Sequence, residues 1–539
     1  MFKSKALKAG AFSLALATVV TGCASEPDEG ETTDEGGDSD GSAEEGGSGE
    51  AGGDLKIGVL SDINTLDPHT ASDVPSGQVH TAIYETLTKF NEDMELEPLL
   101  AESWEATDEN VWEFKLVEGV QFHDGSDFNA EVVKANVERI LDEEIGSPRA
   151  ILFEIIDEVN VIDDYTVEFV TEDPFAPLPD HFAHYASSIV SKESIDGDYE
   201  AMEDGDQAGA YINQNPAGTG FFEFEEWNSG NDVKLVNFED YWGENAKVDT
   251  VTLEVIPEDL TRLGNLESGD MHIVDPVTAS DLARVEGNEG VEPYIRDGAS
   301  ITYLGFNMEK EPFDDPLVRQ ALDMALDKQA MLDGILEGTG EAANGPINDT
   351  QFGYSADIPV QEQDIEGAKE LLAEAGYEDG FETTIWTNDS RERQDIAELA
   401  QANFEEIGVT ANINTVEWGA YLDATGAGEH DMFILGLSLG TGDADYPLHM
   451  LFHSDNAGPP GNRVFMKDDE FDALLQEARI EQDEDQRLAL YKEAVEYLNE
   501  EQPMSFLYHP SHIMGMQSNV QGFWADGSGI YQLQDVTIN

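Results

Sequence analysis

The hydrophobic positions beyond residue 300 switch regularly between the period of strands and the period of helices. Three segments predict strands, at 381–387, 409–417 and 431–437. Segments of helical length separate them, at 391–407 and 418–427. This order predicts a β-α-β-α-β unit in the second half of the chain.

The first half has a mixed pattern. "LKIGVLSD", which starts at Leu55, predicts a buried strand, and a helix is expected from about Val79 to Thr88. Strands are expected in "VWEFKLVEGVQF" and "YTVEFV", and residues 220–242 predict a hairpin with its turn at Asn228–Asn231. Valines and isoleucines on one face predict a helix in "AEVVKANVERILD". Asp caps predict two further helices, in "FDDPLVRQALDMALDKQAMLDGILEG" and "DIEGAKELLAEAGY".

Length and charge limit the class of protein. A chain of 539 residues is too long for one hydrophobic core, so two or more lobes are expected. There are 26 basic and 115 acidic side chains, a net charge of −89, which argues against nucleic-acid and anionic-membrane partners. We interpret the acidity chiefly as adaptation to concentrated salt, where screening is short-ranged and a carboxylated surface stays hydrated.

The N-terminus is typical of an exported lipoprotein. Three lysines precede a short apolar run that ends at Cys23, and this run has the length of a signal peptide. Val20-Thr21-Gly22-Cys23 is similar to the bacterial lipoprotein cleavage site, and Cys23 is the single cysteine. Residues 1–23 are therefore predicted as signal peptide, and the acidic, Gly-rich residues 24–54 as a disordered tether.

The stretch "GLSLGTGDADYP", Gly436–Pro447, has two interpretations. Its beginning matches the G-x-S-x-G nucleophile elbow of serine hydrolases, with Ser438 as nucleophile. However, two glycines and no helix-forming run follow Ser438, whereas a nucleophile elbow requires a helix directly after the turn. The alternative is a glycine-rich turn at a strand end in which a carboxylate, Asp443 or Asp445, binds a cationic ligand.

Two further interpretations of this region remain open. His449 and His453 are four residues apart and could hold a metal together with Asp443 or Asp445. Asp443 could also simply cap the helix that follows it.

Several blocks of sequence together resemble the peptide-type solute-binding lipoproteins of ABC importers, whose members bind dipeptides, oligopeptides, glutathione or nickel. The blocks are "PLLAESWEATDENVWEFKLVEGVQFHDGSDFNAEVVKANVERI", "NPAGTGFF", "FNMEKEPFDDPLVRQALDMALDK" and "IAELAQANFEEIGV". With the strand and turn signals between them, they extend the resemblance over nearly all of 55–539.

The resemblance implies an α/β, two-lobed fold of the periplasmic-binding-protein type, with mixed sheets and a hinge. Lobe one is expected at 55–305 with an extra subdomain at 91–214, and lobe two at 306–500. A return segment, 501–539, goes back to lobe one. The expected crossings between lobes are 301–307 and 502–510.

The resemblance also implies where a peptide binds. Asp443 is expected to pair with the ligand's α-amino group, and the backbone of Gly440 and Thr441 with its main chain. Ser72, Asp73 and Val74 would form the opposite wall, and Ser438, Asp445 and Trp418 are further candidate contacts. Dipeptide binders have a carboxylate-binding arginine near the position of Thr387; this chain offers instead Arg391, Arg393 or Arg463.

The implied function is a lipid-anchored, extracytoplasmic receptor that captures a short peptide by lobe closure and delivers it to an ABC permease. We expect a monomer that needs no cofactor or metal and catalyses no reaction. Three alternatives are a nickel-chelate receptor using His449 or His453, a sugar receptor using exposed aromatics such as Trp418 or Trp386, and a secreted hydrolase using Ser438.

Overall fold

The computed structural model describes residues 52–539 apart from 72, 93, 389 and 460. The predicted signal peptide with Cys23, and the predicted tether as far as residue 51, lie outside the described residues. The described residues belong to one compact unit, Gly49–Asn539. None of the helices in this part of the chain combines the length and hydrophobicity that crossing a membrane requires.

Lobe one contains a seven-stranded mixed sheet with the order β12-β19-β11-β1-β10-β9-β8. The predicted strand at Leu55 is β1, which pairs in parallel with β10 and β11. The predicted hairpin is β8 and β9. The strands are β1 (Asp54–Val59), β8 (Phe222–Asn228), β9 (Asp232–Asn237), β10 (Thr250–Val255), β11 (Ile273–Asp275), β12 (Val291–Asp297) and β19 (Ser511–Gln517). Helices α1 (Val74–Ile83), α5 (Asp259–Ser268) and α6 (Leu282–Glu286) belong to the same lobe.

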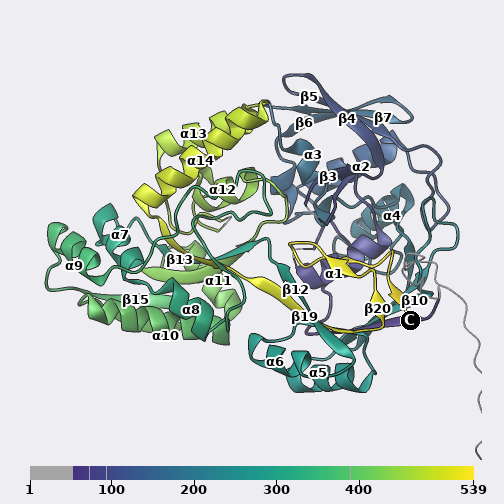
Figure 1. Cartoon of the computed structure of the whole chain (residues 1–539). Helices are drawn as coiled ribbons and strands as arrows, with labels where there is room; N and C mark the ends of the chain where they lie inside the picture. The colour runs from purple at the N-terminus through teal and green to yellow at the C-terminus, as the bar shows by residue number, and fades with distance from the viewer. Residues whose placement is uncertain (1–51, 72, 93, 389, 460) are drawn as a thin grey trace, which may run out of the picture. The chain divides into compact units, whose positions relative to one another are not determined.

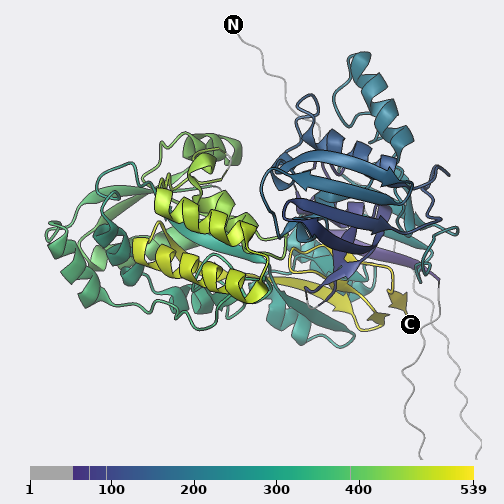
Figure 2. The same cartoon turned by 90° about the horizontal axis from the view of Figure 1, so that it is seen from above.

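A four-stranded antiparallel sheet with the order β4-β5-β7-β6 forms a separate layer of lobe one, the dark blue sheet in Figure 2. Its core joins Phe114 and Phe169 of the sheet to Val133 and Val137 of α2, so the predicted apolar helix face is buried. The elements are β4 (Ala101–Asp108), β5 (Val111–Leu116), α2 (Ala130–Leu141), β6 (Ile156–Asp163), β7 (Thr166–Thr171), α3 (Leu178–His181) and α4 (Lys192–Glu203), with the small hairpin β2 (Thr88–Phe90) and β3 (Leu96–Pro98) beside them.

Lobe two is built on a six-stranded sheet with the order β14-β18-β13-β17-β15-β16. The predicted β-α-β-α-β unit is present, because β15 pairs in parallel with both β16 and β17. Its strands are β13 (Ser300–Phe306), β14 (Glu341–Ala342), β15 (Glu382–Thr387), β16 (Thr410–Thr415), β17 (Met432–Ser438) and β18 (Met504–His509). Its helices are α7 (Pro316–Ala325), α8 (Lys328–Gly334), α9 (Ile365–Glu374), α10 (Arg391–Glu406), α11 (Trp418–Gly426), α12 (Asp445–Phe452), α13 (Asp469–Ile480) and α14 (Glu484–Glu501).

Both faces of this second sheet are buried, which explains the continuous apolar run of β17. Met432 and Ile434 face a core shared with α7, α9 and α10, whereas Phe433 and Leu435 face a core shared with α12, α13 and α14. Figure 1 shows α13 and α14 side by side along one face of lobe two. These two helices therefore lie on the face from which α12 begins.

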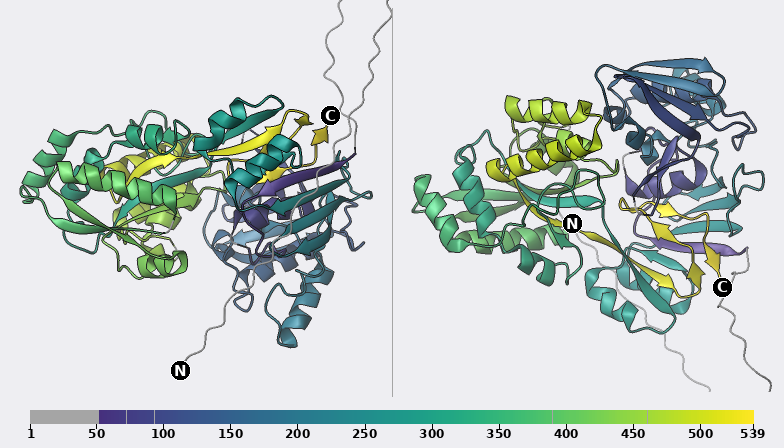
Figure 3. Two further views of the ribbon diagram at one scale, coloured as in Figure 1. Left: turned by 90° about the horizontal axis from the view of Figure 1, so that it is seen from below. Right: turned by 45° about the horizontal axis from the view of Figure 1, so that its top comes forward.

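The chain passes between the two large sheets twice. It leaves the first sheet after β12 and enters the second at β13, and it returns from β18 to β19. Figure 3 shows the yellow return strand beside the teal strand that leaves lobe one, and β19 pairs antiparallel with β12 from Ser511 to Gln517. After β19 the chain ends in four two-residue strands: β20 (Val520–Gln521), β21 (Trp524–Ala525), β22 (Tyr531–Gln532) and β23 (Thr537–Ile538).

Two helix boundaries differ from the sequence prediction. Helix α1 begins at Val74, five residues before the predicted start, because Asp73 caps it through Ser76 N and Pro75 fits its first turn. The long helix predicted after Asp315 is split into α7 and α8, since Asp327 interrupts it and caps the second helix through Ala330 N. Local capping outweighed the apolar period at both places.

Candidate functional site

The loop after β17 does not form a nucleophile elbow. Ser438 is the exposed last residue of β17 and pairs with Ser300, and α12 begins only at Asp445. Among the described residues, no histidine is hydrogen-bonded to the Ser438 hydroxyl. The geometry that a hydrolase needs around this serine is therefore missing from the described part of the chain.

Asp443 is completely buried, and its carboxylate is held by groups of the protein itself. Oδ2 accepts a hydrogen bond from Arg487 Nη2 at 2.8 Å, and Oδ1 accepts from the Tyr491 hydroxyl and from Asp445 N, both at 2.8 Å. Burial raises the pKa of Asp443, while the Arg487 guanidinium opposes that shift. The bond from Asp445 N joins Asp443 to the first residue of α12, whose N-cap residue is Ala444.

Asp445 has a separate ion pair on the same face of lobe two. Arg479 donates to it from Nε at 2.9 Å and from Nη2 at 2.7 Å, a two-pronged arrangement. His449 Nδ1 lies 3.3 Å from Asp445 Oδ1. Burial would raise the pKa of Asp445, but Arg479 and His449 together hold it well below its usual range.

Sequence reasoning missed both arginines, which α13 and α14 supply. Arg487 is fixed further by Phe352, because its guanidinium lies 4.3 Å from the centre of that ring. A signal did exist in the sequence: only 26 side chains of this chain are basic, and Arg479 and Arg487 lie eight residues apart. Nothing local, however, relates them to Asp443 and Asp445.

The loop touches lobe one at Gly440 and Gly442. A Cβ atom on Gly440 would lie 3.0 Å from His184 Cδ2 and 3.2 Å from Ser528 Oγ, and one on Gly442 would lie 2.6 Å from Phe90. Gly442 also has a φ of +68°, which favours glycine. Glycines at these positions allow the backbone of lobe two to approach lobe one closely. Thr441, between them, is buried, and its hydroxyl donates to Asp443 O at 3.3 Å.

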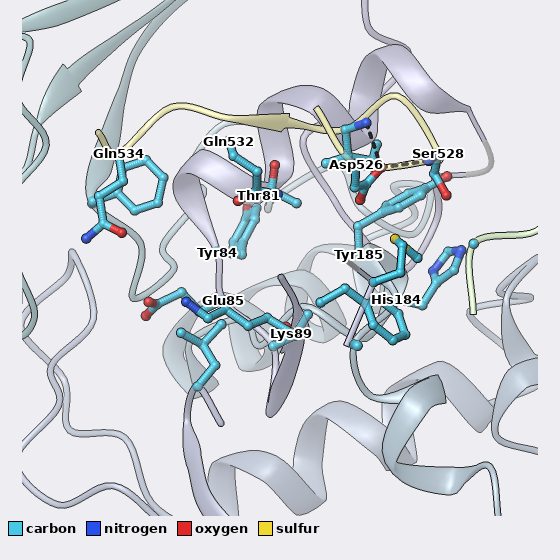
Figure 4. Close-up of a pocket in the computed structure, with 18 of the residues that line it drawn as sticks. Thr81, Tyr84, Glu85, Lys89, His184, Tyr185, Asp526, Ser528, Gln532 and Gln534 are labelled. Carbon is cyan, nitrogen blue, oxygen red and sulfur yellow. Dashed lines mark hydrogen bonds between the residues drawn. The ribbon is translucent and has the colours of Figure 1, made fainter. Parts of the chain in front are cut away.

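A cavity of about 90 Å³ lies at this contact, and we call it the Gly440 cavity. Figure 4 shows its wall, in which Glu85 and Lys89 follow α1, His184 and Tyr185 come from the segment after α3, and Asp526 and Ser528 come from the return segment. Its other lining residues include Thr81, Tyr84, Thr86, Phe90, Met94, Leu99, Phe221, Tyr241, Ile530, Gln532 and Gln534. Hydroxyls, carboxylates and aromatic rings of lobe one thus face the backbone of Gly440 in lobe two.

Glu85 is a buried acid of this cavity. Its Oε1 accepts from the Tyr241 hydroxyl and its Oε2 from Trp242 Nε1, each at 2.7 Å. Burial raises the pKa of Glu85 to about 7, although these hydrogen bonds oppose the shift. Glu85 therefore changes between its protonated and ionised forms close to neutral pH.

The predicted wall of lobe one adjoins an arginine that sequence reasoning did not consider. Asp73 is the N-cap of α1 and Val74 its half-buried first residue, while Ser72 lies outside the described residues. Arg149 donates to Ala71 O from Nε at 3.3 Å and to the Tyr185 hydroxyl from Nη2 at 2.7 Å. No carboxylate of the described residues lies within ion-pair distance of Arg149.

Of the remaining predicted residues, Trp418, Arg393 and Arg463 lie elsewhere in lobe two. Trp418 begins α11 and is 41% exposed, with Tyr421 stacked on it and the Arg393 guanidinium 5.3 Å from its ring centre. Arg463 binds Leu422 O and Thr425 Oγ1. His449 and His453 stack at 5.1 Å, but no group of three or more metal-ligating side chains exists among the described residues.

Comparison with known proteins finds similar sequences over most of the chain. The profile of bacterial extracellular solute-binding proteins, family 5, matches residues 95–459. The glutathione-binding protein GsiB of Salmonella typhimurium is 30% identical over 480 residues, which cover 87% of this chain and 92% of GsiB.

Two solved structures show how far the fold agrees. The periplasmic binding protein DppA of Helicobacter pylori, solved with the peptide STSA, has a TM-score of 0.79 at 30% identity and covers 91% of this chain and 98% of its own. The oligopeptide-binding protein AppA of Bacillus subtilis, solved with a nonapeptide, has a TM-score of 0.76 at 28% identity and covers 91% and 100%.

Proposed function

The chain belongs to family 5 of the bacterial extracellular solute-binding proteins, and we propose that it is a short-peptide receptor of an ABC importer. The ligand is a dipeptide, an oligopeptide or glutathione, captured between the lobes and handed to the permease. Cys23 anchors the receptor by a lipid to the outer face of the cell membrane. The similarity to GsiB and to peptide-bound DppA supports this ligand class.

The contact of Gly440 with His184 and Ser528 is the observation that carries the proposal. It joins the loop after a central strand of lobe two to three segments of lobe one around a single cavity. A ligand at this place is held by both lobes, so its binding energy favours closure.

Arg149 is our candidate for the ligand's carboxylate. It is half-buried, and Tyr185, to which it donates, lines the Gly440 cavity. In a chain with 115 acids, an arginine without a described carboxylate partner is placed to receive one from a ligand. The guanidinium also lies 5.4 Å from the centre of the Tyr185 ring, which restricts its motion.

The role of Asp443 toward a ligand ammonium stays a prediction. Its present partners are Arg487 and Tyr491, so an incoming ammonium shares the carboxylate with Arg487. Ligand contacts by Asp73, Val74, Ser438 and Trp418 are likewise proposals.

Calorimetry with a panel of di-, tri- and tetrapeptides and glutathione tests the proposal. Gly440→Val places methyl groups against His184 and Ser528, so it is expected to hinder closure and weaken peptide binding about 10-fold or more. Gly334→Val is the matched control, since a Cβ there meets nothing within 4 Å. Absence of binding by every peptide and by glutathione at millimolar concentration would sink the proposal.

A further inference from the structure

A second and larger cavity, of about 470 Å³, lies on the other side of the segment that contains His181 and His184. His184 lines the Gly440 cavity, whereas His181 lines this one. We call it the α12 cavity, because Asp445, Tyr446, His449 and Met450 of α12 form its lobe-two wall. Its lobe-one wall includes Ile151, Leu152, Glu154 and Phe175.

Two buried imidazoles in this wall carry unused hydrogen-bond acceptors. His181 Nδ1 lies 2.8 Å from Leu152 O, and His449 Nδ1 lies 3.2 Å from Asp445 O and 3.3 Å from Asp445 Oδ1. Because all three partners only accept, each Nδ1 carries a proton, and in the neutral form of each imidazole Nε2 presents a lone pair. Both Nε2 atoms are buried and have no hydrogen-bond partner among the described residues, and the two histidines are 3% and 7% exposed.

The charges around these lone pairs favour a cation. Glu154, Glu172, Asp173 and Asp455 line the cavity and are exposed, so they attract positive charge from solution. Arg479 is the single arginine or lysine among the described residues of the lining, and it already donates two hydrogen bonds to Asp445. Burial lowers the pKa of His181 to about 4, which keeps this imidazole neutral and accepting at physiological pH.

The apolar part of the wall limits the kind of cation. Ile151, Leu152, Phe175 and Met450 offer a surface for a methylene chain, and the cavity is many times larger than one ion. We propose that the α12 cavity binds an ammonium or guanidinium group on an aliphatic stem, with His181 Nε2 and His449 Nε2 accepting its hydrogen bonds. The cation could belong to a basic side chain of a peptide ligand, and in that case the inference rests on the proposed peptide function. A free polyamine carries the same ammonium groups on an aliphatic stem and is the second source.

Calorimetry on the purified receptor distinguishes these sources with matched probes. Gly-Gly-Lys is compared with Gly-Gly-norleucine, which keeps the stem and lacks the charge, and spermidine is the free cation. We expect the lysine peptide to bind at least about 10-fold more tightly than the norleucine peptide, as a charge-assisted bond contributes. His449→Leu and, independently, Glu154→Gln should reduce that preference to about 3-fold or less.

His272→Leu is the matched control, because this half-buried histidine belongs to lobe one and lies outside the cavity. A folding defect would weaken both peptides equally, so the ratio of affinities isolates the cation site. Binding of spermidine alone, lost in His449→Leu, would support the cation site and refute the peptide function. Equal affinity for the two peptides with no spermidine binding overturns the inference, and so does a preference that survives both variants. Binding of Ni²⁺ or Zn²⁺ that His449→Leu abolishes, with no lysine preference, also overturns it.

Discussion

Two sets of charged side chains in lobe one differ in whether they have partners of opposite charge. In the interior, Arg139 is fully buried and binds Asp67 through Nη1 at 3.1 Å and Nη2 at 2.8 Å, while Nη2 also donates to Asp198 at 2.7 Å. Beside the Gly440 cavity, Arg149 and Glu85 lack an oppositely charged partner within 4 Å among the described residues. The first set has its opposite charges paired within the chain, whereas the second is held by uncharged groups.

The difference cannot come from a shortage of acids, because the chain has 115 of them. Asp198 also accepts from Gly209 N and Tyr211 N, so the interior cluster ties three distant segments together. Arg149 and Glu85 instead use aromatic neighbours, Tyr185 and the Tyr241–Trp242 pair. Neutral partners hold a charged group in place while leaving its charge available.

The largest expected effect is on the interior cluster. Arg139→Met leaves two buried carboxylates without their cation, and we expect the free energy of unfolding to fall by about 3–5 kcal/mol. Lys192→Met is the control, since its pair with Asp196 is exposed and contributes less than about 1 kcal/mol. Urea unfolding of both variants measures the difference. An equal loss of unfolding free energy in the two variants would show that the interior cluster stabilises the fold no more than an exposed ion pair does.

The second expected effect concerns Glu85 and pH. Its folded-state pKa of about 7 lies above the ordinary 4.5, so the folded protein binds the extra proton between these values. Its contribution is therefore fully favourable below pH 4.5 and is lost as pH rises to 7, by about 3 kcal/mol. Glu85→Gln should remove this part of the pH dependence. The exposed Glu109→Gln should leave the profile of unfolding free energy unchanged, and a wild-type profile without this decline contradicts the assignment.

The smallest expected effect concerns Arg149. Arg149→Gln should weaken binding of a peptide with a free carboxylate about 10-fold, or about 1.4 kcal/mol, and leave its C-terminally amidated form unaffected. Arg284→Gln is the control, because Arg284 pairs with Glu267 on the surface. Calorimetry with the two forms of one peptide gives the comparison. Equal losses for both forms would place Arg149 with Arg139 among the structural arginines.

The sequence by itself determined the elements whose signals are local. The apolar run of β17 predicted a strand that is buried on both sheet faces, and caps at Asp315 and Asp364 satisfy early amide groups of α7 and α9. The turn signal at Asn228–Asn231 is also local, and it predicted the β8–β9 hairpin. Together with the family resemblance, these signals predicted the two-lobed α/β fold.

Only the tertiary structure decided which charges remain for a ligand. Arg487 reaches Asp443 across 44 positions in the sequence, because α14 packs on the face of lobe two where α12 begins. Arg149 and Tyr185, and likewise His181 and His449, meet only when distant segments fold together. The physical reason is that a charge is neutralised by whatever lies within a few ångströms of it, and neither hydrophobic period nor motif spacing encodes that neighbour.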